Sequence, residues 1–338
     1  MSLRRLFVAV PAALLALSAC STPGSAAEDT DALVVYNAQH ESLTGLWAER
    51  FTRETGVKVV LRNGRDFELA NQIRAEGGAS PADVFLTENS PAMSLVEQGG
   101  QFTAVNADTL AQVPKRYSTS TGKWVGIAAR STVFVYNTER VSAEKLPASI
   151  MDLADPSWQG RWGASSGGAD YQAIISAMLE LEGEKATSEW LAGMKANFRN
   201  YQGNNAVLQA VNNGEIDGGI IYHYYWYRDQ AKTKENSGNT RLHFFGNQDP
   251  GAFVSVSGGG VLASAKHPEQ AQQFLEFVTG AVGQQVLAES AEFEYSVGSS
   301  VSSNPALKPL AELESPVVDP SRLNGPKVIE LMTRAGII

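Results

Sequence analysis

The sequence predicts an α/β fold in which doubly wound, parallel β-sheets form two lobes. Short apolar segments alternate with helical patterns along most of the 338 residues, which is the arrangement of βαβ units. Two longer apolar runs, over residues 127–136 and 254–262, interrupt this alternation and could cross between lobes. The chain is also long enough for two domains of ordinary size.

The expected first lobe repeats a strand and a following helix. Its strands lie at residues 33–37, 57–61 and 83–87. Gly56 and the pair Gly77-Gly78 end the first two helices, and Ser90-Pro91 begins the third, because proline favours the first helical position. Helix crossovers between consecutive strands imply parallel pairing.

A second α/β pattern follows the first long run. We expect a strand at 162–164, a helix that begins near Tyr171, another around Trp190 and a third that Asn204-Asn205 caps. After the second long run, helices are expected at 271–278, 284–288 and 326–334.

Residues 220–227 read Ile-Ile-Tyr-His-Tyr-Tyr-Trp-Tyr, and they lie where a strand passes into a polar helix. In open α/β sheets, ligands bind at this edge. Core packing is the alternative, because aromatic side chains bury large areas. Four tyrosines in six residues cannot all face one core, however, and each buried hydroxyl needs a partner. We therefore expect at least one adjacent pair to be functional.

Other polar residues also follow strands or loops at this edge. His40 follows the first strand, Glu88 follows the third, Tyr171 follows a Ser/Gly loop, and Tyr224 and Tyr225 end a later strand. If the carboxyl ends of the strands meet, these side chains converge on one cleft. Imidazole, carboxylate and phenol together suit a hard or borderline metal, and Fe³⁺ is the ion that most favours phenolate.

Each residue also has an ordinary structural interpretation. His40 could cap the first helix, Glu88 could be a solvated loop acid, and Tyr171 could be the first core residue of its helix. These alternatives stay open at the level of the sequence.

Residues 1–19 have the pattern of a signal peptide. Arg4 and Arg5 precede an apolar run, residues 6–17, that is too short to span a bilayer. Leu-Ser-Ala-Cys at 17–20 resembles a bacterial lipobox, which predicts lipidation of Cys20 and a polar tether over residues 20–31. Cys20 is the only cysteine, so no internal disulfide can form. A plain secretory signal with an incidental cysteine is the alternative.

Composition narrows the classes of partner. Removal of residues 1–19 takes away two arginines and no acid, which lowers the formal net charge from −9 to −11. The sequence contains no basic stripe, so nucleic-acid binding is disfavoured. Beyond the signal peptide, no run is long and apolar enough to cross a membrane, and the predicted membrane attachment is the lipid anchor alone.

Seven segments, spread in order through nearly the whole mature chain, carry a family resemblance. They are VYNAQH at 35–40, ETGVKV at 54–59, PADVFLTE at 81–88, WQGR at 158–161, LQAV at 208–211, YYWY at 224–227 and QDPGA at 248–252. The sequence resembles the periplasmic ferric-ion-binding proteins, the substrate-binding subunits of bacterial iron ABC importers.

The resemblance implies a two-lobed periplasmic-binding-protein fold, type II-like, with discontinuous lobes and a hinge of crossing strands. Lobe 1 would comprise residues 32–131 and 257–305, and lobe 2 residues 132–256 and 306–338. It further implies a monomeric, extracytoplasmic lipoprotein that captures Fe³⁺ between the lobes and delivers it to permease and ATPase subunits.

The family's histidine and glutamate match His40 and Glu88, and its tandem tyrosines match Tyr224 and Tyr225. Other members have a third tyrosine where Tyr171 falls. Phosphate-dependent members hold a synergistic anion with a Ser-Gly-Ala turn, a glutamine after the glutamate, and asparagines. Here the turn reads Gly-Ala-Asp at 168–170. The candidate anion-binding residues are Asn89, Arg130, Ser166 and Asn204.

Phosphate, carbonate near Arg130, or no anion at all are the possibilities that the resemblance leaves open. The charge of Asp170 at the turn should disfavour a phosphate dianion.

Two other functions remain as alternatives. The first is a clamp of the same fold for a polyamine, a sugar acid or a thiamine-like ligand. The second is a secreted metalloenzyme, which would need an open coordination position and a placed base or nucleophile. The sequence contains no His-Glu-x-x-His or Gly-x-Ser-x-Gly motif, so we expect a binding protein and not an enzyme.

Overall fold

A computed structural model describes residues 31–338 of the chain. The predicted signal peptide and the lipidation site Cys20 lie outside the described residues. Within the described part, no helix is long and apolar enough to cross a membrane.

The described residues form a nine-stranded mixed sheet in the order β2-β1-β3-β9-β4-β7-β5-β6, with β8 paired to β4. The strands are β1 (Leu33–Ala38), β2 (Val59–Asn63), β3 (Val84–Thr87), β4 (Val125–Asn137), β5 (Trp162–Ala164), β6 (Phe198–Asn200), β7 (Gly218–Tyr222), β8 (Thr240–His243) and β9 (Val254–Val261). β1 pairs in parallel with β2 and β3, and β5 with β6 and β7, whereas β4 and β9 run antiparallel to their neighbours.

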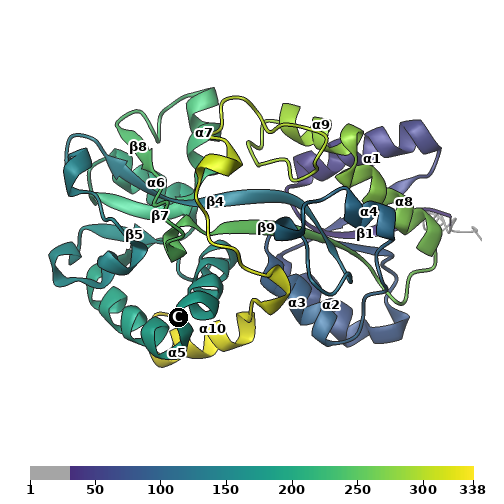
Figure 1. Ribbon diagram of the computed structural model, residues 1–338, viewed down its shortest axis with the longest axis horizontal. Helices are drawn as coiled ribbons and strands as arrows, with labels where there is room; N and C mark the ends of the chain where they lie inside the picture. The colour runs from purple at the N-terminus through teal and green to yellow at the C-terminus, as the bar shows by residue number, and fades with distance from the viewer. Residues whose placement is uncertain (1–30) are drawn as a thin grey trace, which may run out of the picture. The chain divides into compact units, whose positions relative to one another are not determined.

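Ten α-helices accompany these strands in the described part. They are α1 (Glu41–Thr55), α2 (Asp66–Glu76), α3 (Ser90–Gln98), α4 (Ala107–Ala111), α5 (Ala169–Asn197), α6 (Asn204–Asn212), α7 (His223–Lys232), α8 (Pro268–Thr279), α9 (Ala281–Glu289) and α10 (Gly325–Arg334). Figure 1 shows β4 and β9 in the middle, with α1, α2, α3, α8 and α9 towards one end and α5, α6, α7 and α10 towards the other.

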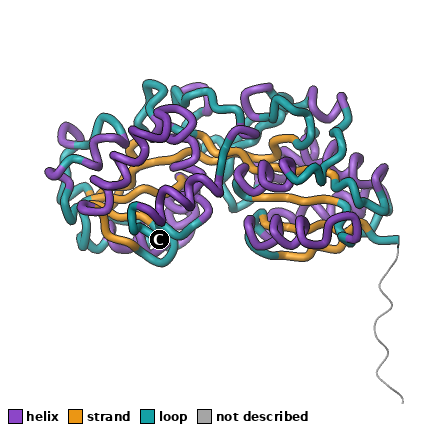
Figure 2. The backbone as a smooth tube through the Cα atoms, turned by 90° about the horizontal axis from the view of Figure 1, so that it is seen from below, coloured by secondary structure: helices purple, strands orange, loops and turns teal. Residues whose placement is uncertain are grey.

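The two long strands connect two halves. Residues 125–131 of β4 pair with β9, whereas residues 132–137 pair with β7 and β8. Strand β4 therefore belongs to the sheet of both halves. We call one half the first lobe (β1–β3, α1–α4, α8 and α9) and the other half the second lobe (β5–β8, α5–α7 and α10). The predicted α/β fold with crossing strands is confirmed, and Figure 2 shows the strands of both lobes between layers of helices.

Each lobe has its own buried apolar core. Trp47, Phe51 and Phe274 belong to the main core of the first lobe, and Trp162 and Trp190 belong to that of the second. Both cores form because each helix buries one apolar face against the sheet.

The exact lobe boundaries remain a prediction. Leu313 still packs in the core of the first lobe, and Val318 packs in that of the second. We propose that the final passage between lobes lies between these two residues, later than the predicted position at residue 306.

Most element boundaries agree with the sequence patterns. Gly56 ends α1 in the left-handed conformation, with φ 78°, which glycine adopts without a steric penalty. The helix expected near Tyr171 and the one expected around Trp190 are joined as α5, with a non-helical break at Gly183. The sequence patterns missed α4, β6 and β8 because each is only three to five residues long.

Candidate metal site

Strand β7 and helix α7 place the tandem tyrosines. β7 ends at Tyr222 and α7 begins at His223, so Tyr224 and Tyr225 lie in the first turn of the helix and not at the end of the strand. Their rings stack with centroids 4.1 Å apart. The Tyr224 hydroxyl is buried and has no hydrogen-bond partner among the described residues, so this oxygen is available to an additional ligand.

Two residues of the first lobe reach the same place. His40 precedes α1 and Glu88 follows β3, and His40 Nε2 lies 3.1 Å from Glu88 Oε1. The His40 ring meets the Tyr224 ring edge-on, with centroids 5.1 Å apart. The His40 side chain makes no capping hydrogen bond to α1. The structure thus brings together His40, Glu88, Tyr224 and Tyr225 from both lobes.

Asp170 lies beside this group, at the start of α5. Its carboxylate accepts hydrogen bonds from Asn89 Nδ2 at 3.0 Å, Asn204 Nδ2 at 2.8 Å and the Tyr225 hydroxyl at 3.1 Å. Asn89 comes from the first lobe, whereas Asn204 and Tyr225 come from the second. Two of the four predicted anion-binding residues therefore bind the Asp170 carboxylate.

The other two predicted anion-binding residues also have partners. Arg130 Nη2 lies 3.1 Å from Glu294 Oε2, and Arg130 Nη1 donates to the Glu88 carbonyl oxygen. Ser166 is buried and donates through Oγ to Asn200 Oδ1 at 3.1 Å. The Ser166 hydroxyl therefore forms its hydrogen bond within the second lobe.

The structure does not bring Tyr171 to the group. Tyr171 packs in the core of the second lobe, and its hydroxyl donates to Met194 Sδ at 3.0 Å. The physical reason is helical periodicity, because Tyr171 shares the apolar face of α5 with Ile174, Ile175 and Met178. In this structure, Tyr171 is therefore a core residue at the start of its helix, as the structural alternative in the sequence analysis described.

The electrostatics around the group favour a cation. Burial raises the pKa of Glu88 to about 7, an effect that the charge of Arg130 opposes and that of Asp170 increases. Burial, with the charges of Glu88 and Asp170, raises the pKa of Tyr224 well above its ordinary value. Each shift reflects the cost of burying negative charges that the nearby charge of Arg130 offsets only in part. A multivalent cation bound here would remove that cost.

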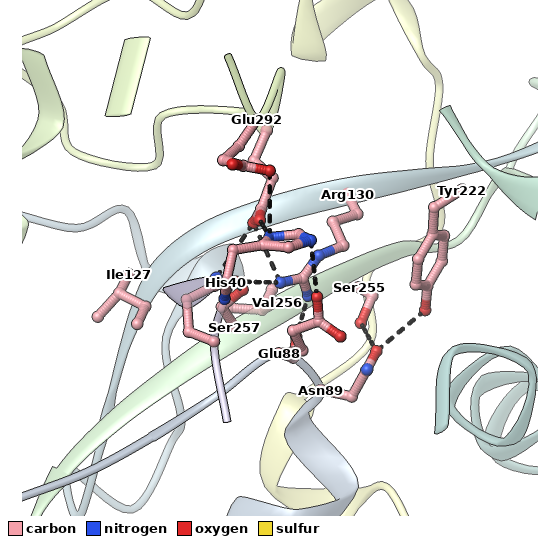
Figure 3. A network of polar contacts seen from close by, with 12 residues as sticks. His40, Glu88, Asn89, Ile127, Arg130, Tyr222, Ser255, Val256, Ser257 and Glu292 are labelled. Carbon is pink, nitrogen blue, oxygen red and sulfur yellow. Dashed lines mark hydrogen bonds and ion pairs between the residues drawn. The ribbon is translucent and has the colours of Figure 1, made fainter. Parts of the chain in front are cut away.

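Sequence reasoning missed three buried acids at the group. Glu294 lies 2.6 Å from His40 Nδ1, Glu292 lies 2.9 Å from Arg228, and Asp66 accepts from the backbone N–H of Glu88 at 2.9 Å. Figure 3 shows His40 between Glu292 and Glu88, with Arg130 alongside. Glu292 and Glu294 follow no predicted strand, so the rule that identified His40 and Glu88 could not find them, whereas Asp66 follows the predicted strand at 57–61 and was overlooked.

A cavity of about 620 Å³ adjoins the group. Asp66 and Glu88 of the first lobe line it, together with Gly168 and Gln172 of the second. The candidate site is therefore reached between the lobes.

Among residues 31–338, no three His, Cys, Asp or Glu side chains are arranged to hold a metal ion. Phenols are not among these side-chain types, and they supply half of the candidate ligands, Tyr224 and Tyr225. Two phenols, one carboxylate and one imidazole form a donor set for a hard or borderline ion once the phenols lose their protons.

The class of protein follows from the sequence match together with this fold. Residues 79–321 match the bacterial extracellular solute-binding protein family, and the chain belongs to it. The chain is 57% identical over 329 residues to the Fe(3+)-binding periplasmic protein of Serratia marcescens. The aligned region covers 97% of each of the two chains.

Solved structures agree with the sequence comparison. The crystal structure of iron-bound HitA from Pseudomonas aeruginosa superposes with a TM-score of 0.83 at 40% identity, covering 90% of this chain and 99% of that one. The structure of Trichodesmium IdiA (FutA) with iron and citrate ligands gives a TM-score of 0.81 at 28% identity, covering 90% and 99%. The predicted two-lobed periplasmic-binding-protein fold is confirmed, and the name of the Serratia relative describes a binding protein.

Proposed function

We propose that this protein captures Fe³⁺ between its lobes and delivers it to an ABC importer. The observation that carries the proposal is the stacked Tyr224–Tyr225 pair beside His40 and Glu88. Within the described part of the chain, the buried Tyr224 hydroxyl has no hydrogen-bond partner. Phenolate is a hard, anionic ligand that suits a trivalent ion better than softer divalent ones. The iron-binding descriptions of the Serratia and Pseudomonas relatives support the same ligand.

In this proposal, His40, Glu88, Tyr224 and Tyr225 hold the ion. Tyr224 and Tyr225 lie on the second lobe and load iron first, and the two residues of the first lobe complete the shell as the lobes close. Iron that contacts both lobes stabilises the closed form by its greater affinity for that form. Binding also releases protons, because each phenol must ionise.

We further propose that Asp170 takes the place of a synergistic anion. Its carboxylate already accepts hydrogen bonds from Asn89 and Asn204, which are the donors that an external anion would need. A phosphate dianion there would face the charges of Asp170 and Glu88 at short range. Iron binding should therefore need neither phosphate nor carbonate.

The remaining features of the proposal follow from the family. As an extracellular solute-binding protein, the chain would present its cargo to permease and ATPase subunits, acting as a monomer without enzymatic activity. A clamp for an organic ligand is the competing function, because the same fold accepts either kind of ligand.

A ferric titration separates these two functions. Purified protein lacking residues 1–20, titrated with ferric salt in phosphate-free and carbonate-free buffer, should develop a visible charge-transfer band that saturates at one ion per chain. The same titration with added phosphate or carbonate should give the same end point. A colourless titration, with a polyamine or sugar acid protecting the protein against thermal unfolding instead, would overturn the ferric proposal.

Membrane attachment is proposed to depend on the lipid at Cys20. Cys20→Ala should move the exported protein from the membrane fraction to the soluble fraction, since acylation supplies the membrane affinity. Ser21→Ala is a matched control that leaves the cysteine in place. Membrane retention of Cys20→Ala after a salt wash would contradict the lipobox prediction.

A further inference from the structure

His40 has a second partner on the side facing away from the candidate ligands. Glu294 Oε1 lies 2.6 Å from His40 Nδ1, whereas His40 Nε2 faces Glu88 Oε1 at 3.1 Å. The two ring nitrogens therefore meet different carboxylates. Only Nε2 lies next to another proposed iron ligand.

Glu294 is held firmly in this position. Its side chain is fully buried, and its second oxygen lies 3.1 Å from Arg130 Nη2 and 3.2 Å from Gln39 Nε2. The neighbouring residue Tyr295 forms a backbone bridge to Ala129 in β4. The carboxylate thus has one oxygen occupied by two donors and the other directed at His40.

The charge environment keeps Glu294 ionised. Arg130, a cation, and the Gln39 amide both donate to the second oxygen of Glu294, and these contacts stabilise the ionised carboxylate in its buried position. An ionised carboxylate can only accept a hydrogen bond. Nδ1 lies closer to Glu294, at 2.6 Å, than Nε2 lies to Glu88, at 3.1 Å, and Arg228 Nη1 can donate to Nε2 at 3.4 Å. These contacts favour a neutral ring with its proton on Nδ1 and its lone pair on Nε2.

We propose that Glu294 is a positioning residue for iron capture: it fixes the tautomer and orientation of His40 so that Nε2 presents its lone pair to the ion. The inference rests on the proposed function, because it takes His40 to be a ligand. Metal-binding histidines commonly donate their other ring N–H to a carboxylate, which orients the ring and increases its basicity. Glu294, Arg130 and Gln39 together supply that support here.

Glu294→Gln tests the inference with little change in volume. The amide oxygen would stay with the donors Arg130 and Gln39, so the amide NH₂ would face His40 Nδ1. That arrangement favours the proton on Nε2, the nitrogen that should bind iron. Glu292→Gln is the matched control, since Glu292 Oε2 lies 3.9 Å from the same Nδ1 and pairs instead with Arg228 at 2.9 Å.

The first readout is the tautomer itself, in iron-free protein. Long-range ¹H–¹⁵N correlation spectra of histidine-labelled protein contain only four rings, and His40→Ala assigns the signal of His40. At a pH high enough to make the ring neutral, wild type and Glu292→Gln should carry the proton on Nδ1. Wild-type protein with the proton on Nε2 would overturn the inference, whether or not the variants fold.

The second readout is ferric affinity against a competing chelator. Glu294→Gln should weaken binding about 10–100-fold, the usual effect of losing such a carboxylate. In a His40→Ala background, the same change should alter affinity by no more than about twofold, because the partner that Glu294 positions is gone. An equal loss of ferric affinity in both backgrounds would overturn the positioning role of Glu294 and leave the proposed ferric function standing. An unchanged affinity in His40→Ala would instead overturn the ligand role of His40, and with it the inference.

Discussion

Tyr224→Phe and Tyr225→Phe are each expected to abolish the visible band of the ferric protein and to remove most of its iron affinity. Two phenolates supply two negative charges against a trivalent ion, and the charge-transfer band arises from them. The fold should survive both changes, because the rings stay stacked and only a hydroxyl is lost. For Tyr224, that hydroxyl has no hydrogen-bond partner to lose among residues 31–338.

One control for this experiment comes from the same helix and the other from the first lobe. Tyr227→Phe removes a phenol from the same helix, where the ring stacks on Phe293 with centroids 6.0 Å apart, and should keep both colour and affinity. His40→Ala should weaken binding but keep the colour, because a neutral imidazole gives no phenolate band. Wild-type colour and affinity in both tandem-tyrosine variants would refute the ferric proposal and favour a clamp for an organic ligand.

Asp170→Ala is expected to have the next largest effect. The substitution removes a negative charge beside the tyrosines and leaves Asn89 and Asn204 without the acceptor they share. Iron affinity in anion-free buffer should fall about 10–100-fold, as for other residues that support a metal ligand. Added phosphate or carbonate should restore part of it, because the vacated donors can then bind an external anion.

Competition with a chelator, with and without phosphate, measures both the loss of iron affinity in Asp170→Ala and its partial recovery with an added anion. Asp152→Ala is a suitable control, since this acid belongs to a capping box in the second lobe, away from the site. An Asp170→Ala protein that binds iron as wild type does, with or without phosphate, would show that Asp170 does not replace an anion.

Periodicity made most of the fold predictable. The apolar residues Leu43, Trp47 and Phe51 bury one face of α1, as their helical spacing indicated. Residues 127–136 were correctly interpreted as one long strand. The antiparallel pairing of β4 and β9 was not predicted, because a strand that crosses between lobes has the same apolar pattern in either direction.

The candidate site was predictable only where residues follow strands. His40 and Glu88 meet because the carboxyl ends of β1 and β3 are neighbours in a parallel pair. Glu294 contacts His40 from a segment 254 residues further along the chain, and no local sequence pattern predicts such a contact. Tyr171 lies in the core of the second lobe, because a residue at the start of a helix can face either the site or the core.

The most direct test of the central claim is the position of iron in a crystal. Protein crystallised with stoichiometric Fe³⁺ and measured above and below the iron absorption edge should give one strong anomalous peak per chain. We expect the peak within coordination distance of the Tyr224 and Tyr225 phenolate oxygens, with His40 Nε2 and a Glu88 oxygen completing the contacts from the first lobe. A peak elsewhere, or no peak between the lobes, would contradict the account.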